Sequence, residues 1–284
     1  MTSTLTGVDP AGQIFLSHRN RAVGVHTRRV RTFTKRNLAA PPGFFACEAA
    51  GLHWLSDAHG ARCAEVVAHD DTSLTLVRLE SVAATEGAAR AFGAALAKTH
   101  DAGARSWGAA PDGWHGHGFF GPLRHPLPMT FADHDSCGQF YAEERLRPML
   151  GLARKALGAD AISDIESAIT RCRAGDFDDE DVPVRLHGDL WNGNIVWTEQ
   201  GAVLIDPASY GGHRETDIAM LHLFGCPFLE AIVDGYQRVH PLLPGWRERI
   251  RMRQLYPLLA HVAIFGSGYA HQAHVAARKA LTLG

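Results

Sequence analysis

The stretch VRLHGDLWNGNIVWTEQGAVLID, residues 184–206, places ionisable and amide side chains between short apolar runs. The apolar runs predict two strands around a polar loop, then a turn at TEQG and a third strand that ends at Asp206. Because a hairpin returns the chain toward its starting end, Asp206 should lie near the loop that holds Asp189 and Asn194. We therefore expect two carboxylates and an amide to converge at the ends of these strands.

The expected cluster of Asp189, Asn194 and Asp206 is suited to binding a cation. If no cation were bound, the repulsion between the two carboxylates would raise the pKa of one of them and destabilise the fold. Oxygen-only ligands favour Mg²⁺ over zinc. The spacing of His187, Asp189 and Asn194 is that of a protein-kinase catalytic loop, with Gly188 where that loop has arginine. Asp and Asn are also common turn formers. The complete set, however, favours phosphoryl transfer.

The first 80 residues predict a small β-rich lobe. Alternating apolar and polar side chains over 22–37 predict a hairpin that carries Lys35. Apolar spacing over 44–60 predicts a helix that carries Glu48 and stops at Gly60. Two further strands should meet at a turn over 69–71. From the residues alone, Lys35 could also be a solvated cation at a strand end, and Glu48 an exposed helix residue.

Helices dominate the predicted second lobe, residues 81–284. Thr85 is a candidate N-cap for an alanine-rich helix that starts at Glu86. Residues 107–128 are rich in Gly, Pro and His and predict a long ordered loop that could border a pocket. Further helices are expected over 137–153 and over 160–174, the latter closed by Gly175. The expected fold class is α+β, with two lobes.

Composition narrows the class of partner. The 284 residues carry 28 Lys and Arg against 30 Asp and Glu, so bulk attraction to nucleic acid or to an anionic membrane is not expected. Five cysteines without a CxxC pair argue against a disulfide framework, and most of the 17 histidines are scattered. No stretch predicts a secretion signal or a membrane span. We expect a cytoplasmic monomer with a small-molecule substrate.

Three segments carry a resemblance to a known family: LHGDLWNGNIVW, VLIDPASYGGHRETDIAMLHLFG and the QLYPLL helix. Together they resemble the fructosamine kinases, or ketosamine-3-kinases, which are relatives of the aminoglycoside phosphotransferases within the protein-kinase-like fold. The resemblance implies two lobes, the use of ATP and Mg²⁺, and phosphorylation of the 3-hydroxyl of a ketose joined through C1 to an amine. The product falls apart and frees the amine, which amounts to deglycation of a fructosamine or ribulosamine.

The resemblance also implies roles for individual residues. The catalytic base would be Asp189, and the metal ligands Asn194 and Asp206. The nucleotide would be bound by Lys35, paired with Glu48, and by the adenine-binding segment around Leu79 and Glu80. Substrate contacts are expected from Trp191, which could instead be a core tryptophan, and from His213, Arg214 and Glu215, which could instead brace the loop. His187 and Asp217 would give structural support, and Asp217 could both cap the helix that follows it and tie that helix to the catalytic loop.

One feature departs from the family pattern. A glycine pair in the first hairpin aligns with Ser17 and His18 here, and these side chains would hinder the approach of the backbone to nucleotide phosphates. Two alternatives stay open, and the second is motivated by Ser17 and His18. One is a kinase for another hydroxyl compound, such as an aminoglycoside or a choline-like alcohol, and the other is a degenerate kinase fold that binds a ligand without turnover.

Overall fold

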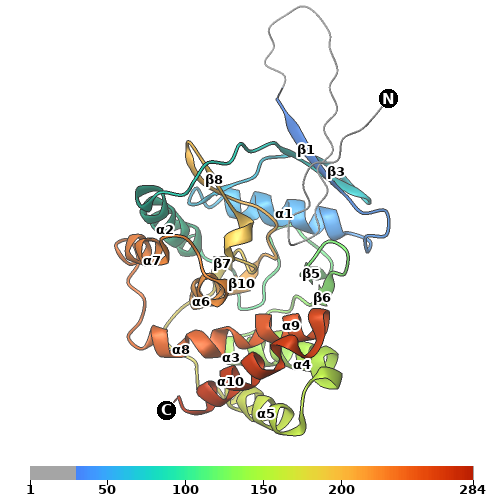
Figure 1. Cartoon of the computed structure of the whole chain (residues 1–284), viewed down its shortest axis with the longest axis vertical. Helices are drawn as coiled ribbons and strands as arrows, with labels where there is room; N and C mark the ends of the chain where they lie inside the picture. The colour runs from blue at the N-terminus through green and yellow to red at the C-terminus, as the bar shows by residue number, and fades with distance from the viewer. Residues whose placement is uncertain (1–29, 284) are drawn as a thin grey trace, which may run out of the picture. The chain divides into compact units, whose positions relative to one another are not determined.

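A three-stranded antiparallel sheet begins the part of the chain that the computed structural model describes, which is residues 30–283 (Figure 1). Its strand order is β1-β4-β3, with bounds Thr32–Arg36 for β1, Val66–Asp70 for β3 and Ser73–Val77 for β4. The predicted pair of strands around the 69–71 turn is confirmed. The first strand of the predicted 22–37 hairpin and the positions of Ser17 and His18 lie outside the described residues.

Helix α1, Phe44–Ser56, packs against this sheet, and it begins where predicted but ends before the predicted stop at Gly60. It follows Gly43, whose φ of 80° is a left-handed conformation that glycine adopts without strain. Phe45 and Leu52 of α1 are almost completely buried, together with Leu74 of β4. This core fixes α1 over one face of the sheet, so the charged residues of β1 and α1 are held at a constant separation.

A second sheet, with the order β2-β9-β8, carries the predicted hairpin. Strand β8 spans Ile195–Thr198 and pairs antiparallel with β9, Gly201–Leu204. The short strand β2, Arg62–Cys63, pairs in parallel with β9 and was not predicted from the sequence, because two residues show no periodicity. Through β2, the segment that follows α1 is joined directly to the hairpin.

Helix α2, Glu86–Asp101, begins where the sequence predicts, and the Thr85 hydroxyl accepts a hydrogen bond from the Ala88 N–H at 3.2 Å. It packs closely along α7, Leu229–Gln237. A Cβ atom on Gly93 would lie only 1.8 Å from the Ile232 carbonyl oxygen. The glycine is therefore required by the close approach of the two helix backbones.

The region predicted as one long loop, residues 107–128, is not wholly irregular. It contains a hairpin of β5, Gly118–Phe120, and β6, Leu127–Met129. Each strand has only three residues, and Pro128 lies within the second, so neither shows a strand pattern. The Phe119 ring meets the Phe44 ring of α1 edge-on at 5.3 Å, and the hairpin therefore touches the small lobe.

Apart from strands β7 to β10, which lie within residues 184–212, the rest of the described chain is mainly helical. The predicted 137–153 helix is interrupted by a π-helical segment, Tyr141–Leu146, just before Pro148. Proline removes a backbone donor to Glu144, and Arg145 instead donates to the Glu144 carbonyl at 3.1 Å. The predicted 160–174 helix is confirmed and ends at Gly175, with φ 86°. The bounds of this group are Cys137–Phe140 for α3, Arg147–Ala153 for α4, Arg154–Ala156 for η2 and Ala159–Ala174 for α5.

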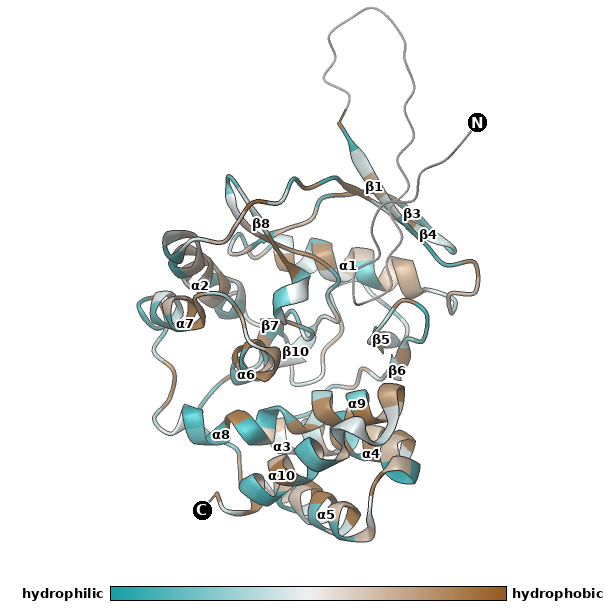
Figure 2. Cartoon of the chain, in the orientation of Figure 1, coloured by the Kyte–Doolittle hydropathy of each residue, from teal (hydrophilic) through white to brown (hydrophobic). Residues whose placement is uncertain are grey.

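The last helices pack around the most hydrophobic one, α9, which is brown over part of its length in Figure 2. Helix α10 packs against α5 and α9, and α4 packs against α9. Among the described residues, no helix combines the length and the apolarity that crossing a bilayer requires. The bounds are Glu215–Phe224 for α6, Trp246–Arg253 for α8, Leu255–Phe265 for α9, Gly266–Tyr269 for η4 and Ala270–Leu281 for α10.

The described chain thus has a small sheet region followed by a mainly helical region, which confirms the predicted α+β class. Contacts join residues 31–284 in one compact unit, so the lobe boundary after residue 80 stays a prediction. A two-stranded ladder, β7 (Val184–Leu186) with β10 (Tyr210–Gly212), lies between the hairpin and the helices. All five cysteines are free, as expected.

Candidate active site

A buried lysine lies at the centre of the candidate site. The Lys35 ammonium on β1 is paired with the Glu48 carboxylate of α1 at 2.6 Å and with the Asp206 carboxylate. Lys35 and Glu48 are each only 8% exposed, so the alternative of solvated side chains is wrong. Burial alone would lower the pKa of Lys35, but the charges of Asp206 and Glu48 outweigh it and raise this pKa. Three segments of the chain therefore meet at one cation.

Asp206 reaches this lysine because of the hairpin register. Ile195 lies opposite Leu204, and the Ile205 N–H donates to the Asn194 carbonyl at 3.1 Å. Strand β9 ends at Leu204, two residues before the predicted end. Asp206 itself has a φ of 55°, a left-handed conformation that is uncommon for a residue other than glycine and is tolerated best by Asn and Asp. The turn away from the strand directs its carboxylate toward Lys35.

Asp189 and Asn194 form the second part of the cluster. The Asn194 amide, on the 3-10 turn η3 (Asn192–Asn194), donates to the Asp189 carbonyl at 2.8 Å and to its carboxylate at 3.2 Å. Burial, together with the charge of Asp206, raises the pKa of Asp189 to about 7, although the hydrogen bond from Asn194 acts in the opposite direction. The carboxyl is therefore poised to gain or lose a proton near neutral pH.

The donor set fits the divalent cation that the sequence implies. Asn194 directs its amide nitrogen to Asp189, which leaves its carbonyl oxygen for a ligand, and Asp206 pairs with Lys35 through one of its two carboxylate oxygens. Oxygen donors of this kind suit Mg²⁺. Burial is the main cause of the raised pKa of Asp189, and the charge of Asp206 adds to it; a cation would relieve this second contribution.

The loop over residues 187–194, which is the candidate catalytic loop, is held by Asp217 of α6. Its carboxylate accepts hydrogen bonds from the backbone N–H groups of His187 at 2.8 Å and Gly188 at 2.9 Å, and it also meets His100 at 3.2 Å. The tie between α6 and the loop is therefore present. The cap is not, because Asp217 lies inside the first turn and α6 begins after Arg214 without a side-chain cap.

His187 supports the loop as a neutral imidazole. Its Nε2 lies 2.9 Å from the Ile205 carbonyl, and its Nδ1 accepts from the Asp189 N–H at 3.2 Å. Burial lowers the pKa of His187, although the charge of Asp217 opposes the shift. One ring nitrogen therefore donates and the other accepts, which fixes the ring between the two ends of the hairpin.

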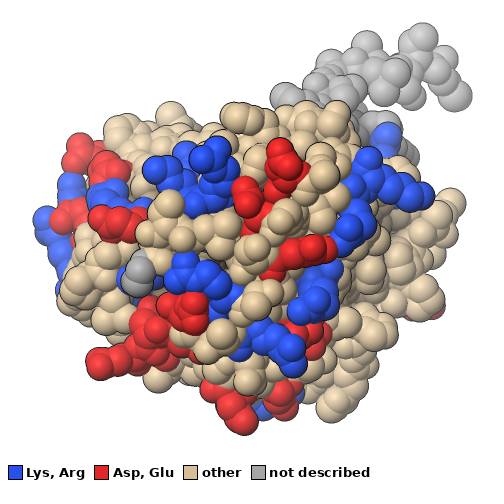
Figure 3. Space-filling model, turned by 90° about the horizontal axis from the view of Figure 1, so that it is seen from below, with Lys and Arg blue, Asp and Glu red and all other residues tan. Residues whose placement is uncertain are grey.

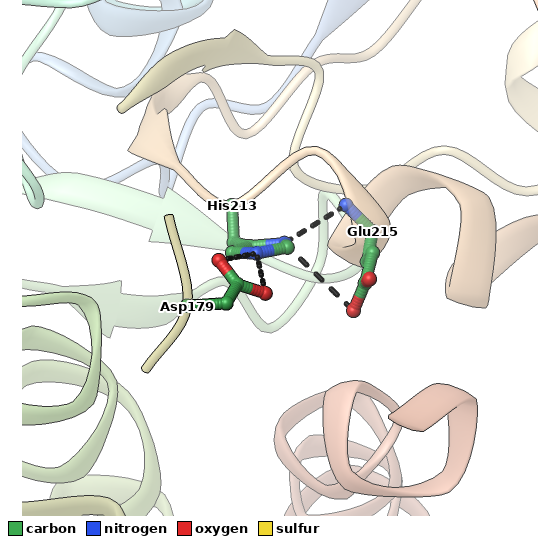
Figure 4. Close-up of side chains that lie close together, drawn as sticks. All are labelled: Asp179, His213 and Glu215. Atoms are coloured by element: carbon green, nitrogen blue, oxygen red, sulfur yellow. Dashed lines mark hydrogen bonds and ion pairs between the residues drawn. The ribbon is translucent and has the colours of Figure 1, made fainter. Parts of the chain in front are cut away.

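His213, Arg214 and Glu215 are all buried, and they are held by hydrogen bonds and ion pairs. His213 meets the Asp179 carboxylate at 3.1 Å, and its other ring nitrogen accepts from the Glu215 N–H at 3.2 Å (Figure 4). Arg214 binds Asp181 at 2.7 Å. These contacts match the bracing role left open above, and a contact with substrate stays a prediction for all three.

Asp179, His213 and Glu215 bring ligand atoms within 4.8 Å of one another, as a metal site would. Their charges are already neutralised, however. Glu215 pairs with Arg249 at 2.5 Å and with Arg253 at 3.5 Å, and Arg253 is only 2% exposed. A metal ion would have to share these carboxylates with two guanidinium groups. We therefore assign the group as an ion-pair brace.

The partners in this brace were missed from the sequence. They come from the loop before β7 and from α8, far along the chain from residues 213–215. The only signals are an acidic run, DFDDED at 176–181, and a basic run, RERIRMR at 247–253. Charge runs usually mark solvated surface, so neither run by itself indicates a buried partner. The partners are Asp179, Asp181, Arg249 and Arg253.

The remaining candidates are Leu79, Glu80 and Trp191. Leu79 follows β4 and packs against the small-lobe core, whereas the Glu80 carboxylate is exposed and pairs with Arg31 at 3.1 Å. Trp191 is partly buried, and its ring meets the Phe224 ring edge-on at 6.1 Å. Trp191 is thus neither a fully buried core residue nor a freely exposed one, and its contact with substrate stays a prediction.

Removing the central cation should be costly. Lys35→Met leaves Glu48 buried without its partner, and we expect a loss of about 3 kcal/mol or more in the free energy of unfolding. Lys35→Met combined with Glu48→Gln should recover part of that loss. Urea unfolding without nucleotide or metal measures both, with the exposed Lys155→Met as the matched control. A loss in Lys35→Met no larger than in the control would contradict a buried ion pair.

The brace should make stability depend on pH. Burial lowers the pKa of His213 in the folded protein, so unfolding takes up a proton once the pH falls below the unfolded value of about 6.5. The free energy of unfolding should therefore fall between pH 7 and pH 5. His213→Gln should flatten this dependence by up to about 1.4 kcal/mol per pH unit. Urea unfolding at three pH values tests this against the exposed His53→Gln, and an unchanged slope would refute it.

Comparison with known proteins agrees with this geometry. A Synechocystis protein assigned as a ketoamine kinase is 33% identical over 88% of this chain and 83% of its own length. The protein-ribulosamine 3-kinase of Arabidopsis thaliana is 30% identical over 85% of this chain and 73% of its own. A solved Thermobifida fusca protein assigned to the fructosamine-3-kinases has a TM-score of 0.81 and 42% identity, covering 89% of this chain and 86% of its own.

At the level of the fold alone, the choline kinase LicA of Streptococcus pneumoniae has a TM-score of 0.59 at 16% identity, covering 90% of this chain and 88% of its own. This likeness confirms the kinase-like fold. The sequence profile of the fructosamine kinase family matches residues 9–282, which is nearly the whole chain. Members of this family are kinases that phosphorylate a sugar hydroxyl, and the chain belongs to the fructosamine kinase family.

Proposed function

We propose that the protein is an ATP-dependent kinase that phosphorylates the 3-hydroxyl of ketosamines and so promotes their deglycation. The observation that carries the proposal is the position of Asp189, a partly buried carboxyl with a pKa near 7, beside Asn194 and the Lys35–Asp206 pair. Membership of the fructosamine kinase family supports the same acceptor. A ribulosamine is one sugar-amine on which a relative acts by name.

Asp189 would act on the acceptor hydroxyl. Its carboxylate takes the hydroxyl proton while the oxygen attacks the γ-phosphorus of ATP, and the bond from that phosphorus to ADP breaks. Burial raises the pKa of Asp189 above its ordinary value, which makes its carboxylate a stronger base for this proton. The hydrogen bond from Asn194 keeps the carboxylate in one orientation. Such positioning of the reacting groups is a large part of catalysis.

The nucleotide would lie between the small sheet and the hairpin. Lys35, held in position by Glu48, is the cation that would bind the phosphates, and Leu79 and Glu80 would border the adenine. Asn194 and Asp206 would hold Mg²⁺, which supplies neutralisation of charge on the β- and γ-phosphates.

Trp191 would line the acceptor site, two residues beyond the base. Its ring offers a flat face to the apolar edge of a sugar, and a protonated amine over that face would gain roughly 0.5–2 kcal/mol. His213, Arg214 and Glu215 would then act mainly by bracing the turn that follows Asp206, since each is already engaged in ion pairs or hydrogen bonds.

We also propose a monomer that works in the cytoplasm on small sugar-amines rather than on nucleic acid. In support, the net charge is only −2. On the face shown in Figure 3, the Lys and Arg side chains of the described residues are interspersed with Asp and Glu. Such a mixture creates no strong field of one sign for a polyanion.

Activity tests the proposal directly. With Mg-ATP and a fructosyl- or ribulosyl-amine, we expect a phosphorylated sugar and ADP in equal amounts, and Asp189→Asn should slow turnover by at least ~10²-fold. An aminoglycoside and choline serve as competing acceptors. Faster transfer to either of them, or nucleotide binding by the folded protein without transfer to any ketosamine, would refute the assignment.

The same variant should stabilise the protein. Because the pKa of Asp189 is raised when folded, the unfolded chain loses its proton first, and folding is opposed as the pH rises from about 4 to about 7. Asp189→Asn removes the unfavourable free energy of keeping this carboxylate ionised in the folded protein. At pH 8 without metal we therefore expect the free energy of unfolding to rise by about 1 kcal/mol or more. At pH 4 the gain should vanish. Urea unfolding at the two pH values checks this. A variant less stable than wild type at pH 8 would contradict the claim that ionised Asp189 destabilises the folded protein.

A further inference from the structure

A row of aromatic rings leads away from the catalytic loop. The Trp191 ring meets the Phe224 ring at 6.1 Å, and the Phe224 ring meets the His261 ring at 4.9 Å. His261 in turn lies 5.5 Å from the Phe265 ring and 5.0 Å from the Tyr269 ring, centroid to centroid. The rings come from the catalytic loop, the end of α6, α9 and η4. This aromatic row, residues 191, 224, 261, 265 and 269, is continuous from its first ring to its last.

At one end of the row, Trp191 packs against the backbone of the loop, and further along the row two of the rings are exposed to solvent. A Cβ atom on Gly193 would lie 2.3 Å from the Trp191 ring, so the indole rests directly on the backbone of the catalytic loop. By contrast, Phe224 is 40% exposed and Phe265 is 60% exposed. Large apolar side chains left this open in a row usually mark a surface that binds something.

The row is also uncharged. His261 donates through Nδ1 to the Pro257 carbonyl at 2.7 Å, and burial lowers its pKa, so its ring is neutral at pH 7. Ring faces of Trp, Tyr and Phe attract cations and apolar groups, and they offer nothing to a carboxylate. The row would therefore discriminate between ligands by charge as well as by size.

The width of the row argues for a small occupant. A stable protein interface buries about 800 Å² on each partner, whereas the open part of this row is a single line of rings. Its continuity with Trp191 ties it to the acceptor site. In a ketosamine, the nitrogen and its substituent leave the sugar at C1, two carbons from the hydroxyl that would face Asp189. The substituent has to extend away from the base, and the row lies beyond Trp191.

We propose that Phe224, His261, Phe265 and Tyr269 extend the acceptor site and select ketosamines whose nitrogen carries an apolar substituent over those with a carboxylate next to the nitrogen. This inference rests on the proposed function. The sugar would lie at Asp189 and Trp191, and the substituent would pack along the open rings. Phe224 and Phe265 are the specificity-determining residues, because they offer the most exposed apolar surface in the row.

Two ketosamines of the same sugar test the selection: the ribulosyl derivative of phenethylamine and that of glycine. We expect wild type to favour the phenethylamine derivative by about tenfold in kcat/KM, at the lower end of what apolar contacts give. Phe265→Ala and Phe224→Ala should each reduce this ratio about threefold or more, mainly through a higher KM for the phenethylamine derivative, because the rings touch no reacting atom.

Phe228→Ala is the matched control, since Phe228 is 46% exposed and lies outside the row, at the N-cap position just before α7. It should leave the ratio at the wild-type value. Equal kcat/KM for the two substrates in wild type, or an unchanged ratio in both row variants, would overturn the inference and leave the kinase activity standing. Transfer to neither substrate would overturn the proposed function and this inference with it. Thermal unfolding of each variant shows whether it is folded.

Discussion

The candidate site depends on one buried ammonium. Lys35 lies on β1, and its two partners come from α1 and from the turn after β9, 13 and 171 residues away. An isolated ammonium would be far too costly to bury, so neither carboxylate is optional. Satisfying this one charge therefore forces the small sheet, its helix and the catalytic hairpin to assemble together. The pairing of strand β2 with β9 joins the segment after α1 to the same hairpin through backbone hydrogen bonds.

Local signals predicted most of the elements and the convergence of the hairpin. Thr85 and Gly175 mark helix ends through their own side-chain or backbone chemistry, and the apolar runs around TEQG specify one register. What the sequence could not predict depends on distant partners. The pairing of β7 with β10 and the contacts of His213 with Asp179 join segments with no shared pattern. Each such contact becomes visible only once the chain has folded.

The glycine at position 188 illustrates how structure explains a departure from the kinase loop. Its φ is 80°, and a Cβ atom there would lie 2.1 Å from the Ala208 carbonyl oxygen. An arginine at this position would have an unfavourable positive φ, and its Cβ atom would clash with that carbonyl oxygen. The loop is instead held by Asp217, whose carboxylate accepts two of its N–H groups. Asp217 of α6 thus ties the backbone of the loop to the helical region.

The arrangement around Asp189 also bears on whether the chain is a catalyst. A carboxyl whose pKa is raised toward neutrality by burial and by the charge of Asp206 opposes folding wherever it is ionised. The φ of 55° at Asp206 adds backbone strain at the neighbouring ligand position. Neither feature stabilises the protein, and substituting Asp189 by Asn would relieve the first without disturbing the core. Strained and destabilising groups gathered at one loop are characteristic of functional sites, where they are retained for chemistry rather than for the fold. The local energetics therefore favour a working kinase over a degenerate binding protein.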